Sequence, residues 1–461
     1  MGTRISLRIA ASASTLVLLI MCFSMMFTNG VSAAEEKLYT KTFRSPGFVH
    51  GPGDVNYKNF AVEMPEGHIA LRSFYAEVVD ENGTPIPLYE TYLHHWIMVR
   101  FYVPTTDSFD GAEASNRSIW VSNSGVCTTL PQMFGLGSET RRTDSTLPPP
   151  YGIVVGDPEM VPDGYKEGWI LNVHSIDTRG AVDAKGCTEC QCDLYTMVVD
   201  KNGNERKLPD GYEGGMECCE DGDHCAVKPE FEHGYGDQGF SNSSSSKRTL
   251  FLEYTVTWVD MSDEVVPVKV YILDVTDQRT SIDDEDESHL CRVEYTVPKC
   301  AEEASECIHT AESLAFLRDG GDVIYAVAHQ HRGGIGSTLY NEDGEEVCSS
   351  LPIYGNGTEA GNEAGYIVGM TTCYPEPGSV RVRGGEKLQL KSLYSNEEQH
   401  TGVMGLFYIV IAQPLKPSGK PYYIANLVLV AVTIIAAFVF IAVTIYRLLR
   451  RRRGGPDYQA V

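Results

Sequence analysis

The sequence predicts an all-β protein made of two tandem β-sandwich, jelly-roll-like domains followed by one C-terminal transmembrane helix. Three observations predict this class. Short runs rich in β-branched and aromatic residues recur along the chain, Asn-Gly and Asp-Gly turn signals separate them, and one long uncharged apolar stretch lies near the C-terminus. A length of 461 residues suits roughly two to four domains.

The strand candidates alternate partly between apolar and polar residues, which is typical of half-buried strands. An amphipathic helix is hard to find in the body, and the best candidate is the segment 301–317. The segments expected to form strands are 92–103, 168–176, 249–259, 265–275, 322–331 and 405–412.

The two ends of the chain predict its compartment. Residues 1–33 carry two arginines, an apolar run and small residues before an acidic pair, as in a cleaved signal peptide; an uncleaved anchor is the alternative. Residues 422–446 form the predicted membrane span, and 447–461 form a basic tail that the positive-inside rule keeps cytoplasmic. We therefore expect a single-pass type I protein of the secretory pathway, in the plasma membrane or an endomembrane, with a lumenal or extracellular body.

Between these ends we place a first domain at 34–280, with a Cys-rich insertion at about 180–240, and a second domain at 290–415. The acidic run at 281–289 is interpreted as a linker rather than a calcium site, because it lacks a Gly-spaced ligand pattern. The formal net charge of −25 argues against a nucleic-acid partner, which needs a basic face.

Cysteines and glycosylation sequons agree with an oxidising compartment. Of 13 Cys, one lies in the signal peptide, which leaves an even number for disulfides; the Cys-rich stretch also admits a zinc knuckle, which we favour less. The pairing cannot be read from sequence. The disulfide candidates are Cys127, Cys187, Cys190, Cys192, Cys218, Cys219, Cys225, Cys291, Cys300, Cys307, Cys348 and Cys373, and the sequons are at Asn82, Asn116, Asn242 and Asn356.

Several histidines lie in apolar strands with spacing that suits a metal. His329 and His331 are two apart, so in a strand they face the same side. His94 and His95 are adjacent, and one ion takes both only at a strand end, at a bulge or through different ring nitrogens. When the pair and His174 are each considered alone, a structural role is the simpler interpretation.

Together with Met404, whose thioether suits copper, these motifs occur in an order that resembles the copper type II ascorbate-dependent monooxygenases. That family includes peptidylglycine alpha-hydroxylating monooxygenase and dopamine beta-monooxygenase. The matching segments are TYLHHWIMV, WILNVHS, AVAHQHRGG and HTGVMGLFYIVIA, and the residues carried over as ligands are His94, His95, His174, His329, His331 and Met404.

The resemblance implies two copper ions, one per ligand set, with ascorbate as reductant and the two sites held apart across solvent. It also implies a substrate-contacting role for Tyr408. The peptide-amidating branch has an arginine two residues before its HxH, and Val327 stands there in this chain. A carboxylate anchor for peptide substrates, and therefore peptide amidation, is in doubt.

Longer motifs cover most of the body. SPGFVHGPGDV, PEGHIALRSFYAEVVDENGTPIPLYETYLHHW, GCTECQCDLY and GGMECCEDGDHC resemble the stress up-regulated Nod nineteen family of plants. That family has no settled biochemical role, so this resemblance implies identity more than mechanism.

The leading hypothesis is thus a membrane-anchored copper monooxygenase-like hydroxylase whose small-molecule or peptide substrate is unknown. The alternative is a non-catalytic, stress-related cell-surface protein on the same scaffold that binds a partner or copper without turnover. The ligands serve both, so the sequence does not decide between an enzyme and a binding protein. It contains no GxSxG motif and no P-loop spacing, which argues against a Ser hydrolase or a nucleotide-binding site.

Overall fold

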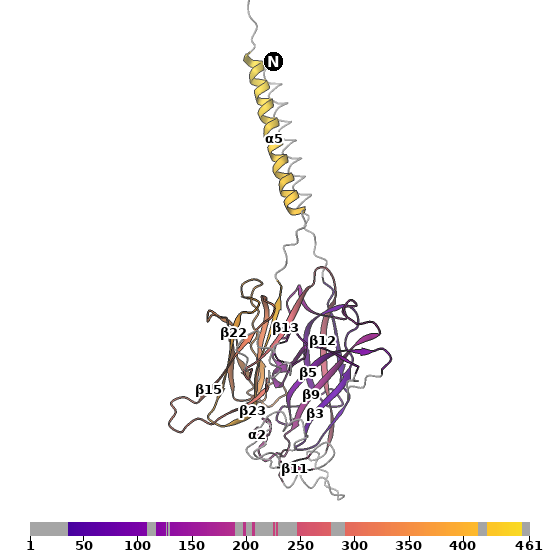
Figure 1. The fold of residues 1–461 in the computed structure, drawn as a ribbon, viewed down its shortest axis with the longest axis vertical. Coiled ribbons are helices and arrows are strands. Elements are labelled where there is room, and N and C mark those ends of the chain that lie inside the picture. Colours follow the sequence, from indigo (N-terminus) through magenta and orange to yellow (C-terminus); the bar gives the residue numbers. More distant parts are fainter. Residues whose placement is uncertain are drawn as a thin grey trace, which may run out of the picture. The chain divides into compact units, whose positions relative to one another are not determined.

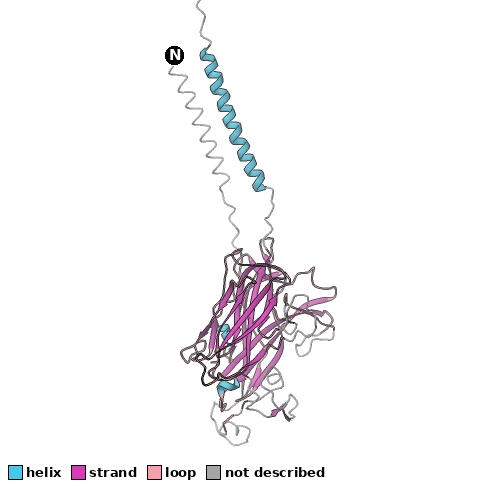
Figure 2. Ribbon diagram, turned by 60° about the vertical axis from the view of Figure 1, so that its left-hand side comes forward, coloured by secondary structure: helices cyan, strands magenta, loops and turns pink. Residues whose placement is uncertain are grey.

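The computed structural model describes most of the body and the C-terminal helix. The described residues are 36–107, 117–125, 127, 130–189, 197–199, 205–207, 225, 227–228, 247–277, 291–413 and 422–453. The chain divides into two units, Met1–Gln413 and Pro414–Val461. Strands are the main regular secondary structure of the described body (Figure 2), which confirms the all-β class.

The largest sheet has ten strands and draws on both halves of the chain. Along it lie β1 (Tyr39–Arg44), β12 (Arg248–Asp260), β4 (Ile69–Val79), β8 (Tyr151–Val155), β13 (Val266–Asp274), β23 (His400–Ala412), β16 (Gly321–Gln330) and β21 (Arg381–Val382), with β2 (Phe48–His50) beside β12 and β14 (Glu294–Val297) beside β23. β13, which precedes the predicted linker, pairs antiparallel with β23, which follows it.

A five-stranded sheet packs against the N-terminal part of this large sheet. It contains β3 (Val55–Val62), β9 (Tyr165–Asp177), β5 (Thr91–Pro104), β6 (Ile119–Val121) and β7 (Phe134–Leu136). Trp96, Met98, Leu171 and Val173 point into the core between the two sheets and are at most 1% exposed. Each such buried side chain contributes roughly 1.5–3 kcal/mol to folding. Because residues alternate along a strand, the other face of β5 and β9 is turned away from this core.

The C-terminal half adds a four-stranded sheet of β15 (Ile308–Phe316), β22 (Lys387–Ser395), β17 (Gly334–Tyr340) and β18 (Glu346–Ser350). In Figure 1, β15 and β22 lie on one side of the body, β3, β5 and β9 on the other, and β13 and β23 between them. The remaining elements are the pairs β19 (Pro352–Tyr354) with β20 (Ile367–Met370) and β10 (Met197–Val199) with β11 (Glu205–Lys207), and the helices η1 (Ser138–Arg141), α2 (Ala184–Cys187) and α5 (Tyr422–Arg453).

All six segments expected to form strands do so, as β5, β9, β12, β13, β16 and β23. The helix expected at 301–317 is wrong, because residues 308–316 form β15. Its apolar residues at 304, 307, 308, 311, 314 and 315 follow a helical spacing, but nine-residue pairing with β22 overrides this local preference.

Eight of the twelve candidate cysteines pair in the structure. The disulfides are Cys127–Cys291, Cys187–Cys225, Cys300–Cys307 and Cys348–Cys373. The bond Cys127–Cys291 joins segments 164 residues apart, whereas Cys300–Cys307 closes a loop of 7. Since a disulfide stabilises by restricting the unfolded chain, the long-range bond contributes more.

The second unit contains α5. Within it, Thr433–Arg450 is long and apolar enough to cross a membrane. This stretch begins within the predicted span 422–446 and ends four residues after it. This confirms the expected C-terminal apolar helix.

Several predictions lie outside the described residues: the signal peptide 1–33, the acidic linker 281–289, most of the Cys-rich insertion, and the end of the basic tail. The sequon residues Asn82 and Asn356 are exposed, so both are accessible to glycosylation, which remains a prediction. Also outside the described residues are Cys190, Cys192, Cys218, Cys219, Asn116 and Asn242.

Candidate metal centre

A β-bulge in β5 places the adjacent histidines on one side of the sheet. Leu93 pairs with Ser175 and His95 pairs with His174, so His94 is the additional residue of the bulge. A bulge rotates the side chain that follows it, which removes the alternation that would otherwise separate neighbours. The bulge therefore allows the adjacent His94 and His95 to bind one ion, as the sequence prediction requires.

Three imidazoles converge at this bulge. One ring nitrogen from each of His94, His95 and His174 lies within 4.8 Å of the other two. The Nδ1 atoms of His94 and His95 are 3.3 Å apart. Two nitrogens bound at about 2.0–2.1 Å to one tetrahedral ion are separated by about 3.3 Å, so this spacing fits a shared metal.

Asn172 fixes the proton of His95. Its Nδ2 donates to Asn59 Oδ1 at 2.8 Å, which turns its Oδ1 toward Nε2 of His95 at 3.2 Å. Nε2 of His95 is then the protonated nitrogen, and Nδ1 carries a free lone pair. This is the arrangement in which an outer partner orients a metal-binding imidazole.

His94 and His174 complete the set. Nε2 of His94 faces the carboxylate of Glu294 at 3.8 Å, which favours the proton on Nε2 and the lone pair on Nδ1. Both ring nitrogens of His174 are buried without a hydrogen-bond partner among the described residues. An unpaired buried polar group costs roughly 1–3 kcal/mol, and a bound cation removes that cost.

The second predicted ligand set lies at the end of β16 and on β23. His329 is the penultimate residue of β16, and His331 follows the strand, with ring centroids 5.2 Å apart. His329 Nδ1 donates to Glu139 Oε1 at 2.5 Å, which leaves Nε2 as the nitrogen available to a metal. That Nε2 has no hydrogen-bond partner in the part of the chain that the structure describes.

Met404 belongs to the same region. It is 2% exposed and lines a cavity of ≈ 70 Å³ together with His95 and His329. The thioether and the imidazoles therefore border one small space, large enough for roughly two water molecules. Hard cations prefer oxygen ligands, so a donor set of imidazoles and a thioether favours a soft metal such as Cu(I).

The structure brings the two ligand sets into contact with each other. The ring of His94 lies 4.2 Å from the ring of His331 and 4.3 Å from the ring of His174, measured between centroids. The resemblance to copper monooxygenases implies two sites held apart across solvent. Here the His94 and His331 rings contact each other between the two sets, and both are buried, with 0% and 1% exposure, so no solvent layer separates the sets.

Burial keeps four histidines of the two ligand sets uncharged. It lowers the pKa of His94, His174 and His331 well below the usual value, and the neighbouring imidazoles lower it further. Burial also lowers the pKa of His95 to about 3. The rings are neutral at physiological pH, which is the state that binds a metal.

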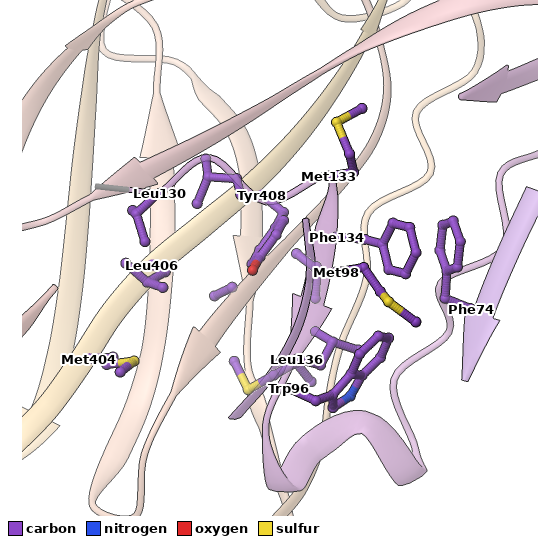
Figure 3. Packing of buried hydrophobic residues seen from close by; sticks show 14 of the residues in the cluster. Phe74, Trp96, Met98, Leu130, Met133, Phe134, Leu136, Met404, Leu406 and Tyr408 are labelled. Atoms are coloured by element: carbon purple, nitrogen blue, oxygen red, sulfur yellow. The ribbon is translucent and has the colours of Figure 1, made fainter. Parts of the chain in front are cut away.

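Tyr408, the residue expected to contact substrate, lies two strand positions beyond Leu406 on the same face of β23 as Met404 (Figure 3). It lines the histidine cavity and a second, apolar cavity of ≈ 50 Å³ that also touches Val327. Its hydroxyl accepts a hydrogen bond from Gln132 Nε2 at 3.4 Å, and burial raises its pKa. Val327, in place of the family arginine, makes this side of the cavity apolar.

Sequence reasoning missed the polar partners of the cluster, which are Asn172, Glu139 and Glu294. Glu139 is 190 residues from His329, and no local motif marks it. Asn172 offered one signal, since it is two residues before His174 and therefore lies on the same strand face.

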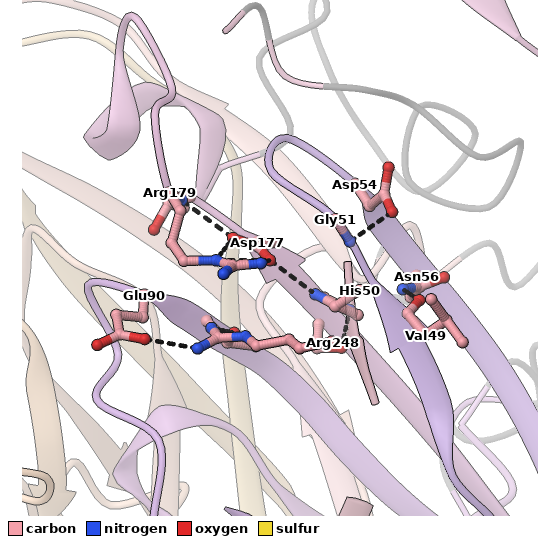
Figure 4. Close-up of polar contacts among 12 residues, drawn as sticks. Val49, His50, Gly51, Asp54, Asn56, Glu90, Asp177, Arg179 and Arg248 are labelled. Atoms are coloured by element: carbon pink, nitrogen blue, oxygen red, sulfur yellow. Dashed lines mark hydrogen bonds and ion pairs between the residues drawn. The ribbon is translucent and has the colours of Figure 1, made fainter. Parts of the chain in front are cut away.

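Another buried histidine, His50, contacts the opposite face of β9 through Ser175, and Figure 4 shows it beside Asp177 and Arg179. His50, from β2, is 0% exposed, and its Nε2 is 2.9 Å from Ser175 Oγ. Its Nδ1 is 3.9 Å from Asp177 Oδ2, and Arg179 binds the same carboxylate at 2.6 Å. Serine, histidine and aspartate are all inaccessible here, so this arrangement has a structural role rather than that of a nucleophile.

Comparison with known proteins adds one informative match. A family model described as stress up-regulated Nod 19 matches residues 36–414. A search of curated proteins finds no match. Among solved structures, the PBCV-1 virus capsid shares 8% identity over 84% of this chain and 96% of its own, with a TM-score of 0.25. An infectious bursal disease virus structure, from strain Gx, shares 11% identity over 84% and 75%, with a TM-score of 0.18. Scores this low carry no argument about fold or function.

Proposed function

This chain belongs to the stress up-regulated Nod 19 family, and we propose that it is a membrane-anchored copper protein that carries out ascorbate-dependent redox chemistry in the manner of a monooxygenase. The observation that carries the proposal is the meeting of His94 Nδ1 and His95 Nδ1 at 3.3 Å beside His174. Because Nε2 of His95 donates to Asn172 and Nε2 of His94 faces the Glu294 carboxylate, the Nδ1 lone pairs of the two rings face each other, and a bound cation would remove their repulsion.

His94, His95 and His174 would hold one copper ion, and His329, His331 and Met404 would hold the other. Bound there, copper supplies one-electron redox chemistry with ascorbate as reductant and dioxygen as oxidant. Asn172 and Glu139 orient the imidazoles that they contact at 3.2 and 2.5 Å. Apolar side chains and Tyr408 line the space beside His329.

The compartment follows from the ends of the chain and the disulfides. Four described disulfides suit an oxidising lumen. The span within α5 would anchor the body, and the arginines that end this helix favour a cytoplasmic tail. A type I topology is therefore part of the proposal.

Burial supports a second candidate, a copper-binding protein without turnover. The ligand histidines other than His95 are between 0% and 3% exposed, which limits the access of a substrate. The first candidate requires a small-molecule or peptide substrate, whereas the second requires none.

The test uses the full-length chain, produced in a secretory host without a polyhistidine tag and purified in detergent. Copper loading followed by ascorbate-dependent oxygen uptake is expected for the wild type. His329→Ala and Met404→Ala are expected to abolish uptake, whereas the exposed His68→Ala is expected to retain it. Normal uptake in either ligand variant would contradict the site, and copper retention without any uptake would favour the second candidate.

A further inference from the structure

We propose that the two ligand sets form one dinuclear copper chamber, in which Glu294 supplies a carboxylate shared between them, rather than two separated mononuclear sites. This inference rests on the proposed function, because it concerns how the same residues arrange the copper ions.

The first support is an unbroken series of imidazoles. His174 contacts His94 at 4.3 Å, His94 contacts His331 at 4.2 Å, and His331 contacts His329 at 5.2 Å between ring centroids. Aromatic rings in direct contact have centroids about 4.5–7 Å apart, so water does not fit between these rings. One imidazole contact, and not a layer of solvent, therefore separates the two sets.

The second support is the position of Glu294. It lies on β14, directly opposite Met404 of the second set in the β14–β23 ladder. Its Oε1 is 3.8 Å from Nε2 of His94 in the first set. Directly opposed residues on antiparallel strands have Cβ atoms about 4.5–5.5 Å apart, so this carboxylate is within reach of both sets.

The third support is charge compensation. Glu139 and Glu294 are 0% and 4% exposed and contact ligand histidines of different sets. Buried cations require nearby anions, because the protein interior solvates charge poorly. Two buried carboxylates match the charge of two monovalent copper ions in one buried space.

The two ligand sets also share the walls of one cavity. Leu130 and Val293 line the same space as His95, His329 and Met404. The disulfide Cys127–Cys291 joins the segments that carry these two wall residues. The covalent bond holds the loop of the N-terminal half against the strand that bears Glu294, which keeps the chamber closed.

The experiment loads the tag-free full-length chain with Cu(II), oxidises it with ferricyanide and removes free ions. Copper per chain is measured by mass spectrometry, and the unpaired spins are counted by electron paramagnetic resonance. We expect two copper ions per chain and a spin count well below two, because two Cu(II) ions in one chamber couple magnetically. Anaerobic acid release of the same sample should restore the full spin count.

Other results separate the two claims. Two copper ions with two full spins, or one copper ion with one full spin, would overturn the chamber and leave the copper function standing. A sample that stays silent after acid release holds Cu(I) and would also overturn the coupled pair. Retention of no copper would overturn both the chamber and the proposed function.

Variants test the shared residues. His331→Ala is expected to bind one copper with a full spin, and Glu294→Gln to weaken the second equivalent about 10- to 100-fold. His68→Ala, on an exposed turn, is the control and should match the wild type. Should His331→Ala fail to fold, stepwise loading of the wild type decides the question. The signal should rise with the first equivalent and fall with the second; a rise with both contradicts the proposal.

Discussion

The two faces of β9 carry two buried histidine clusters of opposite character. On one face, His174 meets His94 and His95 with both of its ring nitrogens unpaired among the described residues. On the other face, Ser175 binds His50 at 2.9 Å, and Asp177 is held by Arg179. Adjacent residues of one strand thus serve two clusters, since side chains alternate across the sheet.

The difference shows that burial does not by itself indicate a metal site. Burial lowers the pKa of His50 to about 3, as it does for His95. What separates the clusters is the direction of the lone pairs. The metal-type cluster has ring nitrogens that face one another, whereas the ring nitrogens of His50 face the Ser175 hydroxyl at 2.9 Å and the Asp177 carboxylate at 3.9 Å.

The largest expected effect is the loss of copper binding when one histidine of the metal-type cluster is replaced by alanine, compared with the same change in the His50 cluster. His174→Ala removes a ligand and should abolish binding of the first-set copper, a loss of more than the 10- to 100-fold typical of outer partners. His50→Ala should leave copper binding intact and only lower the thermal unfolding temperature. Equilibrium dialysis against a copper chelator measures both. Equal copper loss in His174→Ala and His50→Ala would contradict the assignment of the metal site to only one face of β9.

Removal of the metal should destabilise the wild type strongly. A ligand present at 1,000 times its dissociation constant stabilises a folded protein by about 4.1 kcal/mol. Chelation of the copper-loaded chain is therefore expected to lower the unfolding temperature, as measured by scanning calorimetry. The His174→Ala variant should show a smaller shift, and a wild-type shift of zero would count against a site in the folded state.

A smaller effect is expected for the outer partners on the two faces. Asn172→Ala frees the His95 ring and should weaken copper binding about 10- to 100-fold, or about 1.4–2.7 kcal/mol. Ser175→Ala is the matched change on the opposite face, and it should leave copper affinity unchanged while lowering stability by roughly 0.5–1.5 kcal/mol. Competition titrations give the affinities. Loss of affinity in Ser175→Ala alone would reverse the assignment of the faces.

The smallest expected effect is on the pH dependence of stability. The folded pKa of His50, about 3, lies below the unfolded value near 6.5, so the unfolded chain binds more protons between these values. His50 therefore contributes stability that is present above pH 6.5 and is lost as pH falls, by about 1.4 kcal/mol per unit. Chemical denaturation at pH 7.0 and 5.5 should show a shallower decline for His50→Gln than for the wild type. An identical decline would show that His50 does not titrate in this way.

The main features of the metal centre are predictable from sequence because they are local. His329-Gln330-His331 fixes two ligands by strand alternation, and the adjacent His94-His95 pair requires a bulge, which β5 provides. Strand positions such as 92–103 are likewise evident from composition. The segment 301–317 is an exception, because its apolar spacing fits a helix and only long-range pairing with β22 makes residues 308–316 a strand.

Long-range partners could not be predicted, since no local pattern encodes them. Glu139 reaches His329 from 190 residues away, and Glu294 reaches His94 through the pairing of β14 with β23. The motif SPGFVHGPGDV indicated a family without a reason for its residues. In the structure His50 joins the second cluster, and Gly53, with a φ of 84°, accepts a backbone hydrogen bond from Cys225 at 2.8 Å. The motif therefore contacts the strand end just before the Cys-rich insertion and one cysteine within it.

The most direct test of a copper-binding histidine and methionine cluster is copper K-edge X-ray absorption on the tag-free full-length chain, loaded with copper and reduced with ascorbate. We predict imidazole scattering from nitrogens at about 2.0 Å and a sulfur contribution that disappears in Met404→Leu, a change that conserves side-chain volume. Retention of less than one copper per chain, or scattering without the imidazole pattern, would contradict the account.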